Sequence, residues 1–216
     1  MELQDVETSP VETTLYSLSE RAPAPSDRRD GQRHLTLFRV GTMVVEGARE
    51  LCLIKNISGG GLMLRAYCPL AIGQRIEVEL KTGEPLGGTV SWLRDDHIGM
   101  AFDKSIDIVS ILSNTVDGPR PRMPRIETNS FVQVRNGASM LRGRACDISQ
   151  GGVKVHCGTC LPTGSEVVIL LPGMAPQPGV VRWVDDGCAG VTFNHLIPFS
   201  TLIAWLQGQR ETVRAA

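Results

Sequence analysis

NISGGGLML, at residues 56–64, is repeated 91 residues later as DISQGGVKV, at residues 147–155. Two further pairs of blocks align at the same offset: IGQRIEVEL (72–80) with TGSEVVILL (163–171), and TVSWLRDDHIGMAFD (89–103) with VVRWVDDGCAGVTFN (180–194). No gap is needed between these blocks. Chance explains one such alignment but not three at a single offset, so the chain contains two copies of one domain.

Each copy has the pattern of short antiparallel strands. The strands expected in the first copy are rich in β-branched and aliphatic residues and are separated by Gly, Pro or Asp turns. They span 36–45, 50–57, 61–66, 75–81, 86–93 and 97–102. Apolar residues in SIDIVSILSN (105–114) and PFSTLIAWLQGQ (198–209) fit a short helix after each copy. We therefore expect a mainly β protein with two tandem six-stranded antiparallel barrels, each with a short C-terminal helix.

Composition marks the boundaries of the two domains. Residues 1–26 are rich in Ser, Thr, Pro and Glu and lack hydrophobic periodicity, which predicts an acidic disordered tail. Gly and Pro interrupt the strand pattern again in NTVDGPRPRMP (114–124). We expect the first domain at 27–114, a proline-rich linker at 115–124 and the second domain at 120–210.

The 216 residues carry a formal net charge of −1, which is unevenly distributed. The first 27 residues hold six acidic side chains against Arg21 alone, and the rest of the chain is mildly basic. Proteins that bind long nucleic acid usually have a strongly basic composition, so we expect no nucleic acid polymer as a partner. Five Phe, three Trp and two Tyr are also few for a barrel that binds single strands by stacking.

The sequence has no run of 18 apolar residues, so we expect no membrane span. It opens with MELQDVETSP, which is acidic where a secretory signal has a basic region. We therefore expect a cytoplasmic protein. Its six cysteines are then expected to be reduced thiols.

The densest cluster of glycine and polar residues in the first copy lies between two expected strands, at 56–61. The three consecutive glycines allow a positive φ and a close approach to the backbone. Asn56 and Ser58 alternate onto one face of the strand end, while Ile57 points into the barrel. Taken alone, the cluster also fits a tight bend in which Asn and Ser only satisfy turn hydrogen bonds.

A group of arginines precedes the first expected strand. Arg29 and Arg33 are four residues apart, and Arg28 lies beside them. Guanidinium groups are planar forks that suit phosphate oxygens and the O6/N7 edge of guanine. By itself, such a group is more commonly a solvated cluster of charges at a domain boundary.

Together the two motifs resemble the PilZ family, in which Arg-x-x-x-Arg precedes a strand and hairpin, and Asn/Asp-x-Ser-x-x-Gly starts a barrel strand. The resemblance covers nearly all of residues 28–210 as two copies and leaves the acidic tail unexplained. It implies a bacterial receptor for cyclic di-GMP with a six-stranded barrel. Arg29 and Arg33 would then hold guanine edges and phosphates, and Asn56 and Ser58 would hydrogen-bond a guanine.

The resemblance also implies roles for the remaining residues of the motif. Gly61, with Gly60 beside it, would give clearance to the ligand. The family often takes up an intercalated pair of cyclic di-GMP molecules, and the position of Arg28 is where that choice tends to lie. Cyclic di-GMP is then a ligand, and no cofactor is implied.

The second copy matches this pattern only in part. Its Asp-x-Ser-x-x-Gly motif is preserved, and Arg120 falls on Arg29, but Pro124 falls on Arg33. Three prolines in this segment restrict its freedom to fold over a ligand. A structural or interface role is the expectation for this copy. A weak second site would consist of Arg120, Arg125, Asp147, Ser149 and Gly152.

Other motifs have ordinary explanations. Cys157 and Cys160 form a C-x-x-C, but a structural zinc site needs a second pair of ligands, and we expect no metal. The stretch Asp95–His97 reads as a hairpin turn. Trp92 and Trp183 occupy equivalent positions and are expected in the core or barrel wall. No catalytic triad, Walker loop or dinucleotide fingerprint occurs, so we expect no enzyme.

Two functions fit these observations. A cyclic di-GMP receptor would couple ligand binding to a protein partner, with motility, surface polysaccharide or biofilm formation as the output. The alternative is a PilZ-like interaction scaffold that does not depend on nucleotide. The intact motifs of the first copy favour the receptor, whereas the damaged arginine motif of the second copy favours the scaffold.

Overall fold

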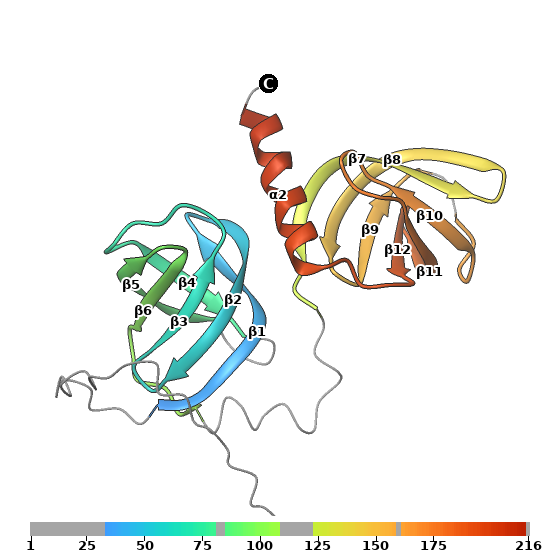
Figure 1. The fold of residues 1–216 in the computed structure, drawn as a ribbon. Coiled ribbons are helices and arrows are strands. Elements are labelled where there is room, and N and C mark those ends of the chain that lie inside the picture. Colours follow the sequence, from blue (N-terminus) through green and yellow to red (C-terminus); the bar gives the residue numbers. More distant parts are fainter. Residues whose placement is uncertain (1–32, 81–84, 109–122, 159–160, 215–216) are drawn as a thin grey trace, which may run out of the picture. The chain divides into compact units, whose positions relative to one another are not determined.

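The computed structural model describes residues 33–80, 85–108, 123–158 and 161–214, and within them the chain forms two closed β-barrels (Figure 1). The side chains of residues 33–38 and 211–214 are not among those described. The expected acidic tail and most of the expected linker also lie outside these ranges. Two six-stranded antiparallel barrels are the architecture that the repeat predicts.

The first barrel follows the strand pattern of the first copy. Its strands are β1 (Arg33–Val45), β2 (Ala48–Ser58), β3 (Gly61–Ala66), β4 (Arg75–Glu79), β5 (Leu86–Arg94) and β6 (His97–Phe102). Their order around the barrel is β1-β2-β3-β6-β5-β4, and the antiparallel pairing of β1 with β4 closes it. Closure leaves no unpaired sheet edge.

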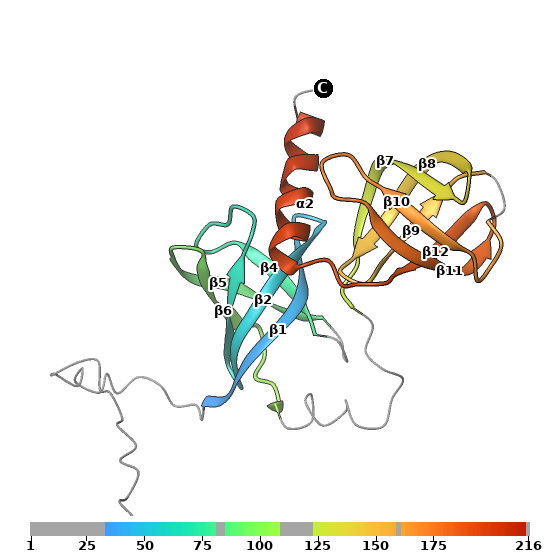
Figure 2. The same cartoon turned by 45° about the vertical axis from the view of Figure 1, so that its right-hand side comes forward.

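The second barrel repeats this topology and is followed by a helix (Figure 2). Its elements are β7 (Ile126–Asn136), β8 (Ser139–Ser149), β9 (Gly152–His156), β10 (Glu166–Leu170), β11 (Gln177–Asp185), β12 (Cys188–Phe193) and α2 (Phe199–Arg214). Here β10 pairs with β7 to close the barrel.

The 91-residue offset extends to irregular details of the strands. A shift of register between Ile54 and Asn56, where β2 pairs with β3, recurs between Ala145 and Asp147, where β8 pairs with β9. Such bulges bend a strand and increase its twist. The repeat therefore preserves the irregularity that aims the Asn/Asp-x-Ser motif as well as the strand order.

Alternating side chains separate the core of each barrel from solvent. In β4, Ile76 and Val78 are buried, whereas Arg75 and Glu77 are exposed, as the sequence pattern predicts. The core of the first barrel includes Met43, Ile54, Ile57, Leu64, Ile76, Val78 and Ile98. The core of the second barrel includes Val132, Val134, Ile148, Val153, Ile169, Val181 and Val191.

The two tryptophans lie on the outside of the barrels. Trp92 is 40 % exposed and Trp183 is 42 % exposed, so neither belongs to the core. Each indole lies against a glycine of the neighbouring strand, Gly99 or Gly190, where any Cβ would collide with the ring. Of the two positions expected from the sequence, the core or the barrel wall, both side chains occupy the barrel wall.

The turns and the C-terminal helix agree with the sequence. Asp95 adopts a φ of 54° in the hairpin between β5 and β6, and Asp96 beside it pairs with Arg65. Helix α2 begins at Phe199, one residue into the segment expected to be helical at 198–209, and extends past it to Arg214. The Nε1 of its Trp205 donates to the Pro172 carbonyl at 2.9 Å. Most of the helix expected at 105–114 lies outside the described residues. No described helix is long and apolar enough to cross a membrane.

Candidate functional site

The Asn-x-Ser-x-x-Gly motif occupies the junction between β2 and β3. Ile57 is buried in the barrel, so its neighbours Asn56 and Ser58 share the outward face, where both are half-buried. The Ser58 hydroxyl donates to the Gly61 carbonyl oxygen at 3.0 Å. This bond leaves the lone pairs of Ser58 Oγ available as acceptors.

The arginine segment runs into β1 beside this junction. Arg33 is the first residue of β1, and its backbone lies opposite Ser58 in the antiparallel register. Further along the pair, Thr36 lies opposite Asn56. The fold therefore brings the backbone of the second arginine of the motif next to the Asn/Ser face. Arg28 and Arg29 lie outside the described residues.

The two glycines at positions 60 and 61 have different structural roles. A Cβ at Gly61 would collide with the Met100 carbonyl oxygen of β6, whereas a Cβ at Gly60 would meet no described atom within 4 Å. Neither these two nor Gly59 has a positive φ, although the sequence allowed it. The close approach of β3 to β6 thus accounts for glycine at position 61.

The junction is also tied to the chain that follows β6. The Phe102 amide donates to the Gly60 carbonyl at 2.9 Å, and the Ile106 amide donates to the Gly59 carbonyl at 2.8 Å. These bonds hold the backbone of the glycine run without using the side chains of Asn56 or Ser58. The polar side chains of the motif are therefore placed by a fixed backbone.

The second barrel has the same junction between β8 and β9. The Ser149 hydroxyl donates to the Gly152 carbonyl at 3.3 Å, and a Cβ at Gly152 would collide with the Val191 carbonyl oxygen. Ser149 is only 2 % exposed. The backbone geometry is therefore repeated, but the serine is less accessible than Ser58.

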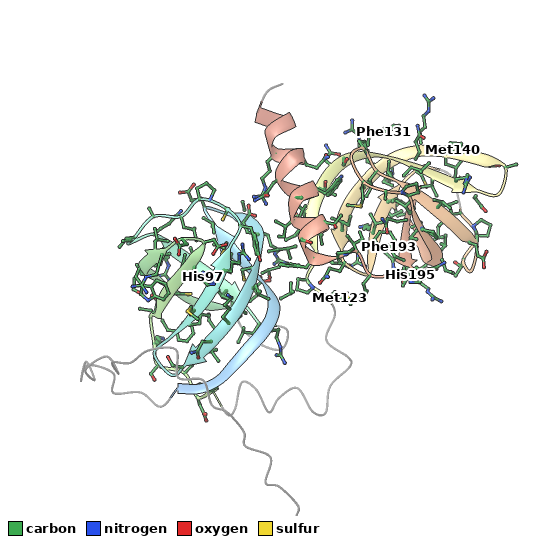
Figure 3. The ribbon with its side chains drawn as sticks, in the orientation of Figure 1. His97, Met123, Phe131, Met140, Phe193 and His195 are labelled. Carbon is green, nitrogen blue, oxygen red and sulfur yellow. The ribbon has the colours of Figure 1, made fainter. Side chains whose placement is uncertain are left out.

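Side chains from the segment before β7 and from the segment after β12 cover this second junction. Asp147, equivalent to Asn56, forms an ion pair with Arg125. The sulfur of Met123 lies 3.0 Å from the Cβ position of Gly151, and Leu196 lies 3.5 Å from it (Figure 3 labels Met123). Arg120 lies outside the described residues. Sequence alignment showed that Arg125 was displaced from the arginine motif but not that it pairs with Asp147.

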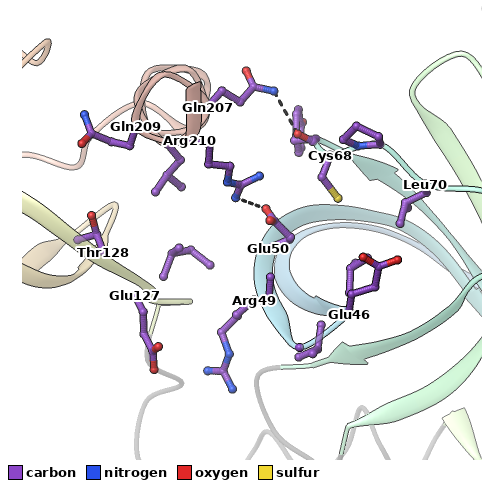
Figure 4. Close-up of a pocket in the computed structure, with 18 of the residues that line it drawn as sticks. Glu46, Arg49, Glu50, Cys68, Leu70, Glu127, Thr128, Gln207, Gln209 and Arg210 are labelled. Atoms are coloured by element: carbon purple, nitrogen blue, oxygen red, sulfur yellow. Dashed lines mark hydrogen bonds and ion pairs between the residues drawn. The ribbon is translucent and has the colours of Figure 1, made fainter. Parts of the chain in front are cut away.

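A separate pocket of about 1620 Å³ is lined by the β1–β2 turn and by helix α2 (Figure 4). Glu50 forms an ion pair there with Arg210, and Gln207 donates to the Tyr67 carbonyl at 3.1 Å. Asn56, Ser58 and Gly61 do not line this pocket. It is therefore distinct from the motif, and the 160 residues between the paired charges explain why no sequence pattern indicated it.

The thiols nearest this region are poor nucleophiles. Burial raises the pKa of Cys52 from 9.0 to about 12, and that of Cys68, which lines the pocket, to about 11. Cys52, Cys68, Cys146 and Cys188 form no disulfide with another described residue, whereas Cys160 of the C-x-x-C lies outside the described residues.

Residues 27–114 and residues 119–208 each match the PilZ domain. The chain belongs to the PilZ domain family. The two matches cover most of the sequence and coincide with the two barrels. The family resemblance carried by Arg29, Arg33, Asn56, Ser58 and Gly61 is thereby confirmed at the level of the family.

Several solved structures are similar to this chain. PlzA of Borreliella burgdorferi in complex with c-di-GMP is 10% identical, with a TM-score of 0.36 over 78% of this chain and 86% of that one. The motility inhibitor MotI/DgrA of Bacillus subtilis is 15% identical, with a TM-score of 0.33 over 83% and 99%. YcgR of Escherichia coli in complex with c-di-GMP is 15% identical, with a TM-score of 0.31 over 82% and 84%. No curated protein sequence matches the chain.

Proposed function

We propose that this PilZ protein is a non-enzymatic receptor for cyclic di-GMP, and that the first barrel carries its main binding site. The observation that supports this most directly is the register of β1 on β2, which sets the Arg33 backbone opposite Ser58. In that arrangement a cationic segment and a polar strand face flank the same point of the barrel. A bound dinucleotide needs both, because it combines phosphates with guanine edges.

The side chains of the motif have the hydrogen-bonding capacity that guanine requires. Asn56 offers an amide oxygen that accepts from guanine N–H groups and an amide nitrogen that donates to O6 or N7. Ser58 already donates to the Gly61 carbonyl, so its remaining role toward a ligand is to accept. Arg28, Arg29 and Arg33 supply the charge and the planar forks for phosphate and guanine.

Gly60 and Gly61 contribute in different ways to this site. Gly60 is exposed and open, so the ligand can approach the backbone there. Gly61 keeps β3 close to β6 and thereby positions Ser58 through the hydrogen bond between them. We assign clearance for the ligand to Gly60 and support of the strand junction to Gly61.

Signalling in this proposal follows from ordering of the arginine segment. Binding shifts the population toward the conformation in which the segment holds the ligand, and this changes the surface offered to a protein partner. The expected outputs are motility, surface polysaccharide or biofilm formation. The acidic residues 1–26 directly precede the arginine segment in the sequence.

The second barrel supports a weaker site or none. Asp147 is already neutralised by Arg125, and Met123 and Leu196 occupy the space over Gly151. A nucleotide bound by Arg120, Arg125, Asp147, Ser149 and Gly152 would have to displace these contacts. This observation favours the alternative function, a scaffold independent of nucleotide, for the second barrel.

Thermal unfolding of the full chain tests the receptor proposal. Cyclic di-GMP at a hundred times its Kd should raise Tm by roughly 5–10 °C, because ligand at that level stabilises the folded state by about 2.7 kcal/mol. GTP and cyclic di-AMP are the controls, and each should leave Tm unchanged at the same concentration. An equal shift with all three nucleotides, or none with cyclic di-GMP, contradicts the proposal.

A further inference from the structure

The outer surface of the β7–β8 hairpin carries large apolar side chains in solvent. Phe131 on β7 is 42 % exposed and Met140 on β8 is 49 % exposed, and both lie on the outside of the second barrel (Figure 3). On the adjacent strand β10, Val168 and Leu170 are half-buried and lie opposite Arg135 and Gln133. Apolar side chains thus occur on three neighbouring strands of this surface, with Arg135 and Gln133 of β7 between those of β8 and β10.

Arginines are interleaved with these apolar residues. Cross-strand pairs place Phe131 opposite Arg144, Gln133 opposite Arg142, and Arg135 opposite Met140. We call the outward side chains of these pairs the hairpin face: Phe131, Gln133, Arg135, Met140, Arg142 and Arg144. The face has three positive charges and no carboxylate.

The arginines of the hairpin face have no partner of opposite charge within the described residues. Arg144 Nη1 donates to the Asn129 carbonyl at 2.9 Å, which holds the side chain but does not neutralise it. All three arginines are exposed. The charge of this surface is therefore available to another molecule.

The same positions of the first barrel are occupied differently. Leu51, equivalent to Arg142, is only 2 % exposed and belongs to a cluster that includes residues of α2. Arg49, equivalent to Met140, pairs with Glu79 at 2.7 Å. In the first barrel the equivalent face is covered at Leu51 and its Arg49 is paired with Glu79, whereas in the second barrel the face is exposed and positively charged. Folding alone does not account for exposed Phe131 and Met140 among arginines.

We propose that the hairpin face is a docking surface for an acidic protein segment that carries apolar side chains. Arginine, aromatic residues and methionine are the types enriched in the cores of protein interfaces. Three positive charges without a counterion are complementary to a short acidic segment, and they direct its approach. They are few for a nucleic acid, for which about six to ten phosphate contacts are common.

The hairpin face would be the partner site of the proposed receptor, so its biological role rests on that function. Binding of an acidic segment to this face does not require nucleotide, so nucleotide binding and peptide binding are tested separately. Calorimetry with cyclic di-GMP tests the receptor function, whereas the experiment below measures peptide binding in the absence of that ligand. A chain that binds nucleotide but not the peptide would overturn only the docking surface.

Fluorescence anisotropy with the full chain and a labelled synthetic peptide tests the docking surface. The peptide has phenylalanine and leucine between glutamates, and a second peptide has glutamine at every glutamate position. We expect saturable binding of the acidic peptide, weakened at least about tenfold by Arg142→Glu and by Phe131→Ser, and little binding of the neutral peptide. An oligothymidine probe tests nucleic acid as the alternative occupant.

Matched variants on the first barrel control for general charge and stability. Arg94→Glu reverses an exposed arginine of β5, and Ile72→Ser removes an apolar side chain that is 67 % exposed. Both should bind the acidic peptide as the wild type does. Equal loss in the control variants, equal affinity for the neutral peptide, stronger binding of oligothymidine to the same face, or no binding of the acidic peptide would each overturn the proposal.

Discussion

Arg125 forms an ion pair with Asp147 at the position where the first repeat has the uncharged Asn56. A carboxylate at this point of the barrel attracts an arginine of its own chain, and the pair neutralises both groups. Asn56 carries no charge that an arginine could neutralise. The change from Asn56 to Asp147 between the repeats therefore explains why Arg125, displaced from the arginine motif, lies over the junction of the second barrel.

Equivalent substitutions in the two repeats should have unequal effects on cyclic di-GMP binding. Asn56→Ala should weaken binding about tenfold, because it removes hydrogen bonds to guanine worth about 1–3 kcal/mol. Asp147→Ala should leave the tight binding unchanged, since Arg125 already occupies the carboxylate. Calorimetry on both full-length variants measures the difference. A similar loss in the two variants would contradict the assignment of the main site to the first barrel.

Ser58→Ala should reduce affinity less than Arg33→Ala. A neutral hydroxyl contributes about 0.5–1.5 kcal/mol, whereas a hydrogen bond from a charged donor contributes about 1.5–3 kcal/mol. Ser149→Ala is the matched control, because Ser149 makes the equivalent bond to Gly152 in the second barrel. The affinity of Ser149→Ala for cyclic di-GMP should equal that of the wild type. The ranking fails if Ser58→Ala and Arg33→Ala lose the same affinity in titrations under identical conditions.

Neighbouring glycines should differ in their effect on folding. Gly61→Val should destabilise the protein by roughly 2–4 kcal/mol, because its Cβ collides with the Met100 carbonyl of β6. A Cβ at Gly60 would meet no described atom within 4 Å. The free energy of unfolding of Gly60→Ala should therefore lie within about 1 kcal/mol of the wild-type value. Urea unfolding of both variants measures this. Equal stability of the two would show that the approach of β3 to β6 is not what requires glycine.

The stability of the protein should fall at alkaline pH partly through Cys52. Burial raises its pKa from 9.0 to about 12, so above pH 9 the unfolded state releases a proton that the folded state retains. The contribution is fully present below pH 9 and is lost as the pH rises toward 12. Between pH 9 and pH 12 the free energy of unfolding of Cys52→Ala should therefore decrease less than that of the wild type. Parallel pH profiles for the two proteins would contradict the burial effect.

The sequence predicted the repeated architecture because apolar alternation and turn residues recur at one offset. Register shifts such as that between Ile54 and Asn56 follow the same offset, so the repeat carried information about backbone geometry. It also carried the motif that places the candidate site. The strand pattern, the register shifts and the motif are either local in the sequence or repeated in it, and such features are predictable from one sequence.

Contacts between distant residues were not predictable in the same way. Trp92 has a large aromatic side chain that favours burial, but the absence of a Cβ at Gly99 leaves room for its ring on the outer surface of the barrel. Arg210 and Glu50 are 160 residues apart, and neither belongs to a motif. The pairing of such residues depends on the packed structure, which a single sequence does not specify.

Isothermal titration of the full-length protein with cyclic di-GMP tests the central claim most directly. We expect saturable binding to the wild type. In Arg33→Ala the affinity should fall roughly ten- to a hundredfold, because one charge-assisted contact worth about 1.5–3 kcal/mol is lost. Arg125→Ala, which alters only the second barrel, should retain the tight binding. No heat with the wild type at saturating ligand, or full affinity in Arg33→Ala, would contradict the receptor.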